Sequence, residues 1–239
     1  MKRLIGTCVL FLISVFPVFS ADMQHAEDLY RQGRFAAALG EYEELLQTYP
    51  NNPHLYYNIG NCYFKMGTLG LAAANYYRAF RLAPRDEDTR HNLTLVLQSS
   101  GERFVPAGMP EILHKAFFGV TLSELKGIFF VSLWLFCIVA GIWCIKRRFG
   151  MVALLLLCAV AICGSWYLWR AQLQAQPLAV VAIPVAELRS GPGTNFPASA
   201  NVAQGHLLLL QDSRDHWKEV IVKSQGIKGW IDENALEQI

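Results

Sequence analysis

Histidines and carboxylates are the side chains that most often perform catalysis or hold metals. In this sequence the histidines are scattered, and the carboxylates cluster at Glu41, Glu43 and Glu44, which we expect to form a solvated helix face. The histidines are at positions 25, 54, 91, 114, 206 and 216, and no two have the spacing of a metal-ligand motif. H-E-x-x-H, G-x-S-x-G and Walker motifs are absent, and Gly191-Pro-Gly193 lacks the lysine and helix that follow a phosphate loop. We therefore predict a protein that is not an enzyme, with no metal and no cofactor.

The cysteines also lack the pattern of a disulfide framework or a redox motif. Cys8 lies in the N-terminal leader, Cys62 is the one cysteine in a segment of soluble character, and the rest lie in two long apolar runs: Cys137, Cys144, Cys158 and Cys163. No histidine or carboxylate shares those runs, so packing is a better explanation than metal binding. We expect Cys62 to be a small buried apolar residue.

The clearest pattern in the sequence suits binding rather than catalysis. It is an internal repeat of 34 residues between residues 22 and 98. The repeat pairs Gly33 with Gly67 and Pro50 with Pro84, which suit a tight turn and a helix end. The other pairs are small or aromatic: Ala26 with Gly60, Leu29 with Tyr63, Ala38 with Ala72, and Tyr42 with Tyr76.

The segment 21–100 resembles a tetratricopeptide repeat domain of two repeats and a closing helix. The resemblance rests on G-R-F-x-x-A-L-x-x-Y from Gly33 and on Y-x-x-x-G-x-x-x-x-A-x-x-x-Y from Tyr63. The resemblance implies five helices, at about 22–32, 35–48, 53–66, 69–82 and 86–99. It also implies a concave face, made by the first helix of each pair, that binds partner proteins. The partner-binding residues would be Glu27, Tyr30, Arg31, Tyr57, Asn61, Phe64, Lys65 and His91. The alternative is that the aromatic residues among them only pack between helices.

The N-terminus and the middle of the chain have the composition of membrane segments. Residues 1–20 have a basic start and an apolar core, then Pro17, and end at Ser20, which predicts a secretory signal peptide; an uncleaved anchor is the alternative. Only 17% of the residues are charged, against about 25% in a typical soluble protein. The deficit lies mainly in two runs of about 20 residues, which predict transmembrane helices at 126–145 and 150–170.

Charge predicts the orientation of this hairpin. The turn at 146–149 contains Lys146, Arg147 and Arg148, which places it in the cytoplasm by the positive-inside rule. Both soluble segments would then lie outside the cytoplasm, close to each other. The segment 101–125 would be a linker with an amphipathic interfacial helix at 111–118, and Thr121 with Glu124 would form a capping box at the first span.

From residue 178 the pattern changes to short strands divided by turns, expected at 179–183, 185–188, 206–211, 218–222 and 228–231. The segment 178–239 resembles a bacterial SH3-like domain, through L-R-S-G-P-G-T-N from Leu188, through Gly205, and through W-x-x-V and G-W-I. The resemblance implies a small all-β barrel. Its ligand surface would include Phe196, His216 and Trp217, although Trp217 could equally be a packing residue. The aromatic residues that bind proline-rich peptides are missing.

The complete order predicts a multi-domain protein: an all-α repeat domain, a two-helix transmembrane hairpin and a small all-β SH3-like barrel. This order resembles the Bat aerotolerance-type accessory proteins of bacteria. The resemblance implies an inner-membrane scaffold whose periplasmic domains bind other membrane or periplasmic proteins, among them von Willebrand A-type proteins. Peptidoglycan binding through the SH3-like domain is the alternative, and an accessory subunit of a membrane enzyme is a third. The net charge of +2 gives no reason to expect nucleic acid.

Overall fold

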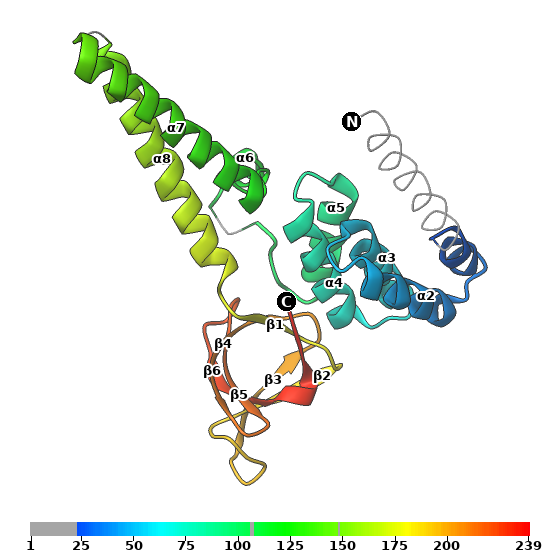
Figure 1. Cartoon of the computed structure of the whole chain (residues 1–239). Helices are drawn as coiled ribbons and strands as arrows, with labels where there is room; N and C mark the ends of the chain where they lie inside the picture. The colour runs from blue at the N-terminus through cyan, green and yellow to red at the C-terminus, as the bar shows by residue number, and fades with distance from the viewer. Residues whose placement is uncertain (1–22, 106–107, 148) are drawn as a thin grey trace. The chain divides into compact units, whose positions relative to one another are not determined.

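The computed structural model describes residues 23–105, 108–147 and 149–239, so the predicted signal peptide lies outside the described residues. The chain divides into two compact units (Figure 1). One unit joins the N-terminal segment, up to Pro106, to the C-terminal segment Leu178–Ile239, and the other is Ala107–Pro177. Segments far apart in the sequence therefore fold together in the first unit.

The N-terminal part of the first unit is a series of antiparallel helices. A helix over residues 23–31 is followed by α2 (Phe35–Thr48), α3 (Pro53–Lys65), α4 (Leu69–Leu82) and α5 (Glu87–Ser99). These bounds agree with the prediction to within one residue or two. Gly33 and Gly67 have φ of +78° and +80°, the left-handed conformation that glycine adopts readily, and each turns the chain within a helix pair.

Local side-chain chemistry starts two of these helices. The Asn52 side chain accepts a hydrogen bond from the His54 amide, with Pro53 at the first position of α3. The Asp86 side chain accepts a hydrogen bond from the Thr89 amide at the start of α5.

Small residues let these helices pack closely. Gly60 is buried in α3, and a Cβ at this position would lie 2.7 Å from the Tyr76 ring of α4. The repeat-matched residues Ala38, Tyr42 and Ala72 are buried, as is Cys62. Cys62 belongs to a core cluster with Tyr42 and six other apolar residues: Ala26, Leu29, Ala38, Leu45, Leu55 and Ile59. The repeat period therefore marks the residues that hold one helix against the next.

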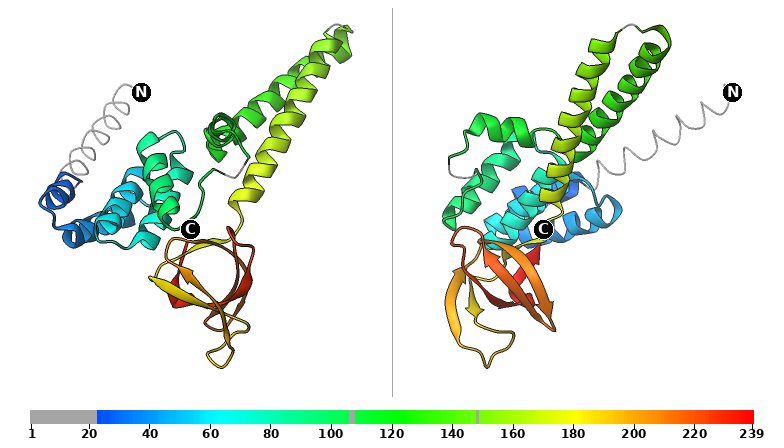
Figure 2. Two further views of the ribbon diagram at one scale, coloured as in Figure 1. Left: turned by 180° about the vertical axis from the view of Figure 1, so that it is seen from behind. Right: turned by 90° about the vertical axis from the view of Figure 1, so that its left-hand side faces the viewer.

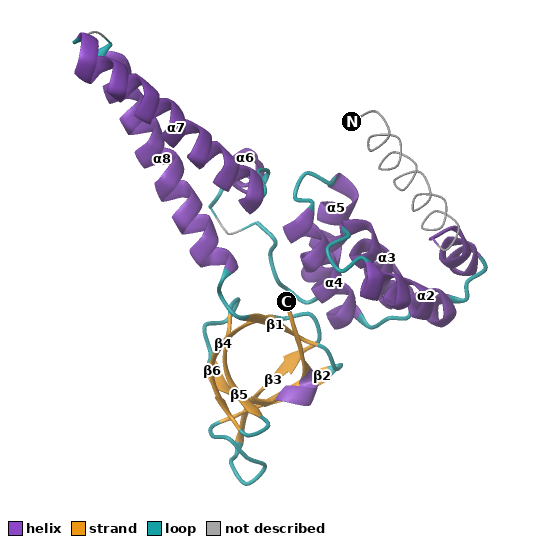
Figure 3. Cartoon of the chain, in the orientation of Figure 1, coloured by secondary structure: helices purple, strands orange, loops and turns teal. Residues whose placement is uncertain are grey.

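The C-terminal part of the first unit is a seven-stranded antiparallel sheet in the order β3-β2-β6-β5-β4-β1-β7 (Figure 3). The strands are β1 (Leu178–Val181), β2 (Val185–Arg189), β3 (Ala198–Ala203), β4 (Leu207–Arg214), β5 (Trp217–Val222), β6 (Lys228–Asp232) and β7 (Leu236–Gln238). A short 3-10 helix, η1 (Glu233–Ala235), precedes β7. The sheet curls around a core that includes Leu188, Leu208 and Ile231.

The closed barrel predicted from the sequence is not confirmed. In the described strand order β3 and β7 are the two edges of the sheet and do not pair with each other. Neither edge strand was predicted. β3 consists mainly of alanine, serine and asparagine, which have low strand propensity, and β7 is only three residues long. What the structure shows is an antiparallel sheet with two open edges.

The sheet packs on the helices through its first and last strands. β1 and β7 both contact α4. Gly70, at the start of α4, is buried where a Cβ would overlap the carbonyl oxygen of Val181 in β1. On the other side of this contact, the Ser100 hydroxyl donates to the Gln204 carbonyl at 2.8 Å, and buried His206 lies 2.8 Å from Glu102. The sheet and the helices therefore share an interface.

The second unit is built around two long antiparallel helices, α7 (Leu122–Lys146) and α8 (Gly150–Gln174), which lie side by side in both views of Figure 2. Each has 25 residues, with mean hydropathies of 2.6 and 2.3, so both are long and apolar enough to cross a membrane. The predicted capping box begins α7, where the Thr121 side chain accepts from the Glu124 amide and Glu124 accepts from the Thr121 amide.

The short helix α6 (Glu111–Phe118) packs on the end of α8. The Arg170 guanidinium donates to the carbonyls of Phe117 and Val120, and it lies 4.6 Å from the centroid of the Phe118 ring. The opposite face of α6 leaves Ile112 and Leu113 76% and 58% exposed. The structure therefore has the amphipathic helix that the sequence predicted, and it joins that helix to the hairpin.

Candidate functional site

The first candidate site is a cavity of about 270 Å³ inside the repeat region, which we call the inner pocket. It lies between the first helices of successive pairs and the closing helix α5. Its lining is Tyr30, Tyr57, Asn61, Phe64, Lys65, Tyr76, Asn92 and Leu95. Five of the eight residues predicted for partner binding are therefore brought together: Tyr30, Tyr57, Asn61, Phe64 and Lys65.

A hydrogen-bond network orders the polar wall of the inner pocket. The Tyr76 hydroxyl donates to Asn61 Oδ1 at 2.7 Å. Asn92 Nδ2 donates to the same oxygen at 3.2 Å and to the Tyr57 hydroxyl at 3.3 Å. The Asn61 carbonyl is therefore occupied. Its amide N–H groups and the Tyr57 hydroxyl hydrogen make no hydrogen bond to a described residue, so they remain available to a ligand.

The electrostatics of the inner pocket favour ligands rich in acceptors. No carboxylate lines it, and Lys65 makes no ion pair with a described residue. Burial, with smaller contributions from Tyr57 and Tyr30, raises the pKa of Tyr76, and burial likewise raises the pKa of Tyr30. These phenols therefore stay protonated at neutral pH. N–H and O–H donors, one cation and aromatic walls suit the carbonyl groups of a peptide segment.

Three predicted partner-binding residues lie outside this cavity. Arg31 pairs with Glu27 and with Asp28, each at 3.4 Å, on the surface of the first helix. His91 is exposed on α5 and does not line the pocket. The neighbouring Asn92 takes the inward position that was expected of His91.

Three residues of the inner pocket were missed by the sequence interpretation. Tyr76 was assigned to packing alone, and Asn92 and Leu95 were not considered. The buried residues Leu93, Val96 and Leu97 mark the packed face of α5, and Asn92 and Leu95 are three residues apart beside it. That spacing places them on one face of the helix, so the apolar pattern of α5 was the available signal.

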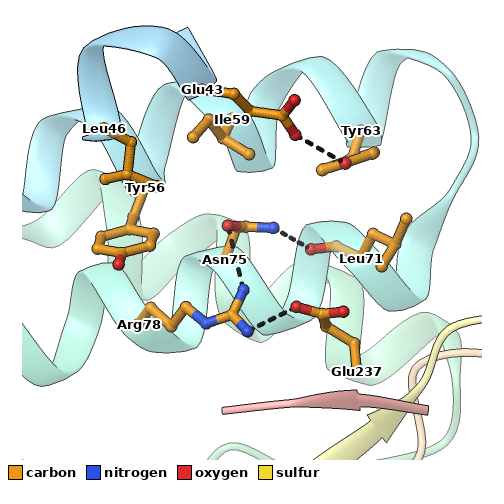
Figure 4. A pocket seen from close by; sticks show the side chains of 9 residues that line it. All are labelled: Glu43, Leu46, Tyr56, Ile59, Tyr63, Leu71, Asn75, Arg78 and Glu237. Atoms are coloured by element: carbon orange, nitrogen blue, oxygen red, sulfur yellow. Dashed lines mark hydrogen bonds and ion pairs between the residues drawn. The ribbon is translucent and has the colours of Figure 1, made fainter. Parts of the chain in front are cut away.

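The second candidate site, which we call the junction pocket, has a volume of about 330 Å³ and lies where the helices meet β7 (Figure 4). Arg78 of α4 reaches Glu237 of β7 at 2.6 Å and also donates to the Gln238 carbonyl. The Tyr63 hydroxyl donates to Glu43 at 3.3 Å. The full lining is Glu43, Leu46, Tyr56, Ile59, Tyr63, Leu71, Asn75, Arg78 and Glu237. No sequence motif pointed to this pocket.

The residues predicted for the SH3-like ligand surface are divided between two loops. Phe196 is 38% exposed in the β2–β3 loop. His216 and Trp217 lie at the β4–β5 turn, where His216 is exposed and Trp217 half-buried. A 2.8 Å hydrogen bond joins His216 Nδ1 to Glu233, and this bond raises the pKa of His216 and lowers that of Glu233.

Metal and thiol chemistry find no support in the described part of the chain. Within it, no group of three or more histidine, cysteine, aspartate or glutamate side chains is placed to hold a metal ion. Cys62 is completely buried, and burial raises the pKa of its thiol to about 12, so it is not a nucleophile at neutral pH.

Comparison with known proteins identifies the helical segment. A family model described as tetratricopeptide repeat matches residues 23–87. Tetratricopeptide repeat protein 16 of Macaca fascicularis and of Homo sapiens is 32% identical over 72 residues, which is 30% of this chain and 8% of theirs. The match to these relatives thus spans less than a tenth of their length.

Among solved structures, the type III secretion translocator chaperone SycD of Yersinia enterocolitica aligns over 61% of this chain and 82% of its own, at 14% identity and a TM-score of 0.34. The family model and the curated relatives establish the nature of the helical segment. Residues 23–87 form a tetratricopeptide repeat region, of a family whose members generally bind other proteins.

Proposed function

We propose that this protein is a non-enzymatic membrane scaffold that binds an extended segment of a partner protein in the inner pocket. The proposal rests on hydrogen-bond donors that have no acceptor among the described residues: the amide of Asn61, the hydroxyl of Tyr57 and the ammonium group of Lys65. The carbonyl and carboxylate groups of a peptide supply the complementary acceptors, and the rings of Tyr30 and Phe64 supply apolar contact.

In this proposal α7 and α8 are a transmembrane hairpin. Their length and hydropathy support it, and the basic turn supports a cytoplasmic position for Lys146 and Arg147. The repeat region and the β-sheet, as an SH3-like module, are then on the periplasmic side of a bacterial inner membrane. The partners are membrane or periplasmic proteins, von Willebrand A-type proteins among them, as in Bat aerotolerance-type complexes.

The test is site-specific photo-crosslinking in native membranes. A photoreactive amino acid replaces Phe64 in the inner pocket or, as the control, Gln47, which is exposed on α2. We expect a defined protein adduct from position 64 alone, lost when Tyr57, Asn61 and Lys65 are all changed to alanine. The same adducts from both positions, or an adduct that survives the triple change, would refute the proposal. A reporter at Phe149 tests the orientation independently.

The β2–β3 loop supports a second candidate function, recognition of peptidoglycan. Arg189 Nη1 donates to the carbonyls of Thr194 at 2.9 Å and Phe196 at 2.7 Å, which orders the loop that presents the exposed Phe196 ring. If this ring binds cell wall, the detergent-solubilised chain sediments with purified peptidoglycan and the Phe196→Ala variant does not. Equal sedimentation of the two proteins, or of neither, would leave the inner pocket as the functional site.

A further inference from the structure

The junction pocket is separate from the inner pocket, although both use α3. The two cavities share no lining residue. Tyr56, Ile59 and Tyr63 of α3 face the junction pocket, whereas Tyr57, Asn61 and Phe64 line the inner one. The helical period of 3.6 residues explains this division, because it sends the two sets to different faces of one helix. The junction pocket is therefore a second place where a ligand can bind.

The charges around the junction pocket leave one carboxylate without a counter-ion. Arg78 and Glu237 neutralise each other, and the guanidinium also donates to the Gln238 carbonyl and, at 3.5 Å, to Asn75 Oδ1. Glu43 makes no ion pair with any described residue. Among the described residues, Glu43 accepts a hydrogen bond from the Tyr63 hydroxyl alone, at 3.3 Å, and Figure 4 shows this bond. The pocket has a net negative charge, located at Glu43.

The remaining lining matches an alkyl chain that ends in a cation. Tyr56 and Tyr63 provide aromatic rings, and Leu46, Ile59 and Leu71 provide apolar contact. Burial raises the pKa of Tyr63 to about 12, with Glu43 adding to the shift, so this phenol remains neutral at neutral pH. Ammonium and guanidinium groups bind both carboxylates and aromatic faces, and their alkyl stems lie along apolar surface.

We propose that the junction pocket binds a lysine or arginine side chain of a partner protein, with Glu43 as the charge partner and Tyr63 as the aromatic wall. The volume of about 330 Å³ is at the lower end of the range for ligand pockets, about 300 to 1,000 Å³, which suits one long side chain with its adjoining backbone. Because β7 contributes Glu237 to the lining, the complete pocket forms only while the sheet is packed on α4.

The test uses the full-length chain in lipid nanodiscs and two peptides, acetyl-Ala-Lys-Ala-amide and the same peptide acetylated on the lysine Nζ. Saturation-transfer NMR, with empty nanodiscs as the reference, measures contact with the lysine methylene protons. We expect the charged peptide to bind about tenfold more tightly than the neutral one. Glu43→Gln abolishes that preference, whereas Glu44→Gln, on the exposed surface of the same helix, retains it.

Three further variants separate the binding of the lysine peptide from folding and from the inner pocket. Tyr63→Phe keeps the ring and retains most of the preference, and Tyr63→Leu loses it. Combined alanine substitution of Tyr57, Asn61 and Lys65 leaves binding of the lysine peptide unchanged, so failure here and failure of the proposed function are distinguishable. Equal binding of the two peptides, no binding of either at about 20 mM, or an unchanged preference in Glu43→Gln would each overturn the proposal.

Discussion

The two pockets on α3 differ in where their residues come from in the chain. The inner pocket is lined by residues between Tyr30 and Leu95, all within the helical segment that ends with α5, and it contains a lysine and no carboxylate. The junction pocket needs Glu237, which follows Arg78 by 159 residues, and it contains Glu43. One pocket belongs to the repeat itself, whereas the other is made when a second structural element packs on the repeat.

This difference predicts that mutations can remove one pocket and leave the other intact. The repeat region and the sheet share an interface through α4, β1 and β7, so they cannot act as two independent modules joined by the apolar hairpin. Changes that separate the sheet from α4 should eliminate the junction pocket and leave the inner pocket intact. Changes within the polar network of the inner pocket should have the reverse effect.

We expect Gly70→Ala to give the largest difference between its effect on the junction pocket and its effect on the inner pocket. The added Cβ would overlap the Val181 carbonyl oxygen, so one backbone must shift, and we expect the opening free energy of the β1 and β7 amides to fall by about 3 kcal/mol. Hydrogen-exchange mass spectrometry of the full chain measures this change. Gly40→Ala is the matched control: nothing lies within 4 Å of that helical glycine, and alanine there should stabilise α2 by about 0.5–1 kcal/mol. Unchanged protection of β1 in Gly70→Ala would contradict the interface.

We expect changes in the Arg78–Glu237 pair to give a smaller difference between the two pockets. The two side chains are 26% and 35% exposed, so solvent screens the pair in part, and we expect Arg78→Met to cost about 1–2 kcal/mol in protection of β7. A double-mutant cycle with Glu237→Gln isolates the coupling between the two side chains. Additive effects would mean that the pair does not hold the sheet on α4.

Within the inner pocket, Tyr76→Phe removes the hydroxyl that donates to Asn61 at 2.7 Å. We expect a loss of about 1 kcal/mol in the protection of α3 and α4, and no change in β1 or β7. Tyr56→Phe is the control, because its hydroxyl donates to the Pro50 carbonyl in an exposed position and should matter less. A loss that spreads to β7 would show that the two pockets are coupled through α3.

The smallest effect concerns alkaline pH. The folded-state pKa of Cys62 is raised from 9.0 to about 12, so the folded chain holds a proton that the unfolded chain loses first. The contribution of this thiol is complete well below pH 9, begins to decline as pH approaches 9, and is lost as pH passes about 12. We expect about 0.4 kcal/mol of repeat-region stability to be lost at pH 9. Urea titrations between pH 7.5 and 9.5 measure how the free energy of unfolding changes with pH. Cys62→Ala should make this dependence less steep, and an unchanged dependence would contradict the raised pKa of Cys62.

Local signals determined most of the helical structure. The period of 34 residues placed the helix pairs, because the turn glycines and small packing residues recur wherever one helix crosses the next. Asn61, Lys65 and Tyr57 were predicted to share a face through the resemblance to tetratricopeptide repeats, and their spacing of four residues agrees with this because residues four apart lie together on a helix. Thr121 with Glu124 predicted the start of α7. Uninterrupted apolar composition predicted two long helices at 126–145 and 150–170, which the structure extends to Leu122–Lys146 and Gly150–Gln174. Each of these features depends on neighbours within a few residues.

Only the tertiary structure decided how distant segments meet. β3 has weak strand propensity and forms because β2 pairs with it, and β7 is short and forms against β1. No local pattern identifies Glu237 as the partner of Arg78, since the ion pair depends on the sheet packing on α4. The same holds for Asn92, whose amide is placed by the packing of α5 against α3. The sequence by itself therefore determined the repeat and the apolar hairpin, whereas the junction and the open edges of the sheet depended on contacts between residues far apart in the chain.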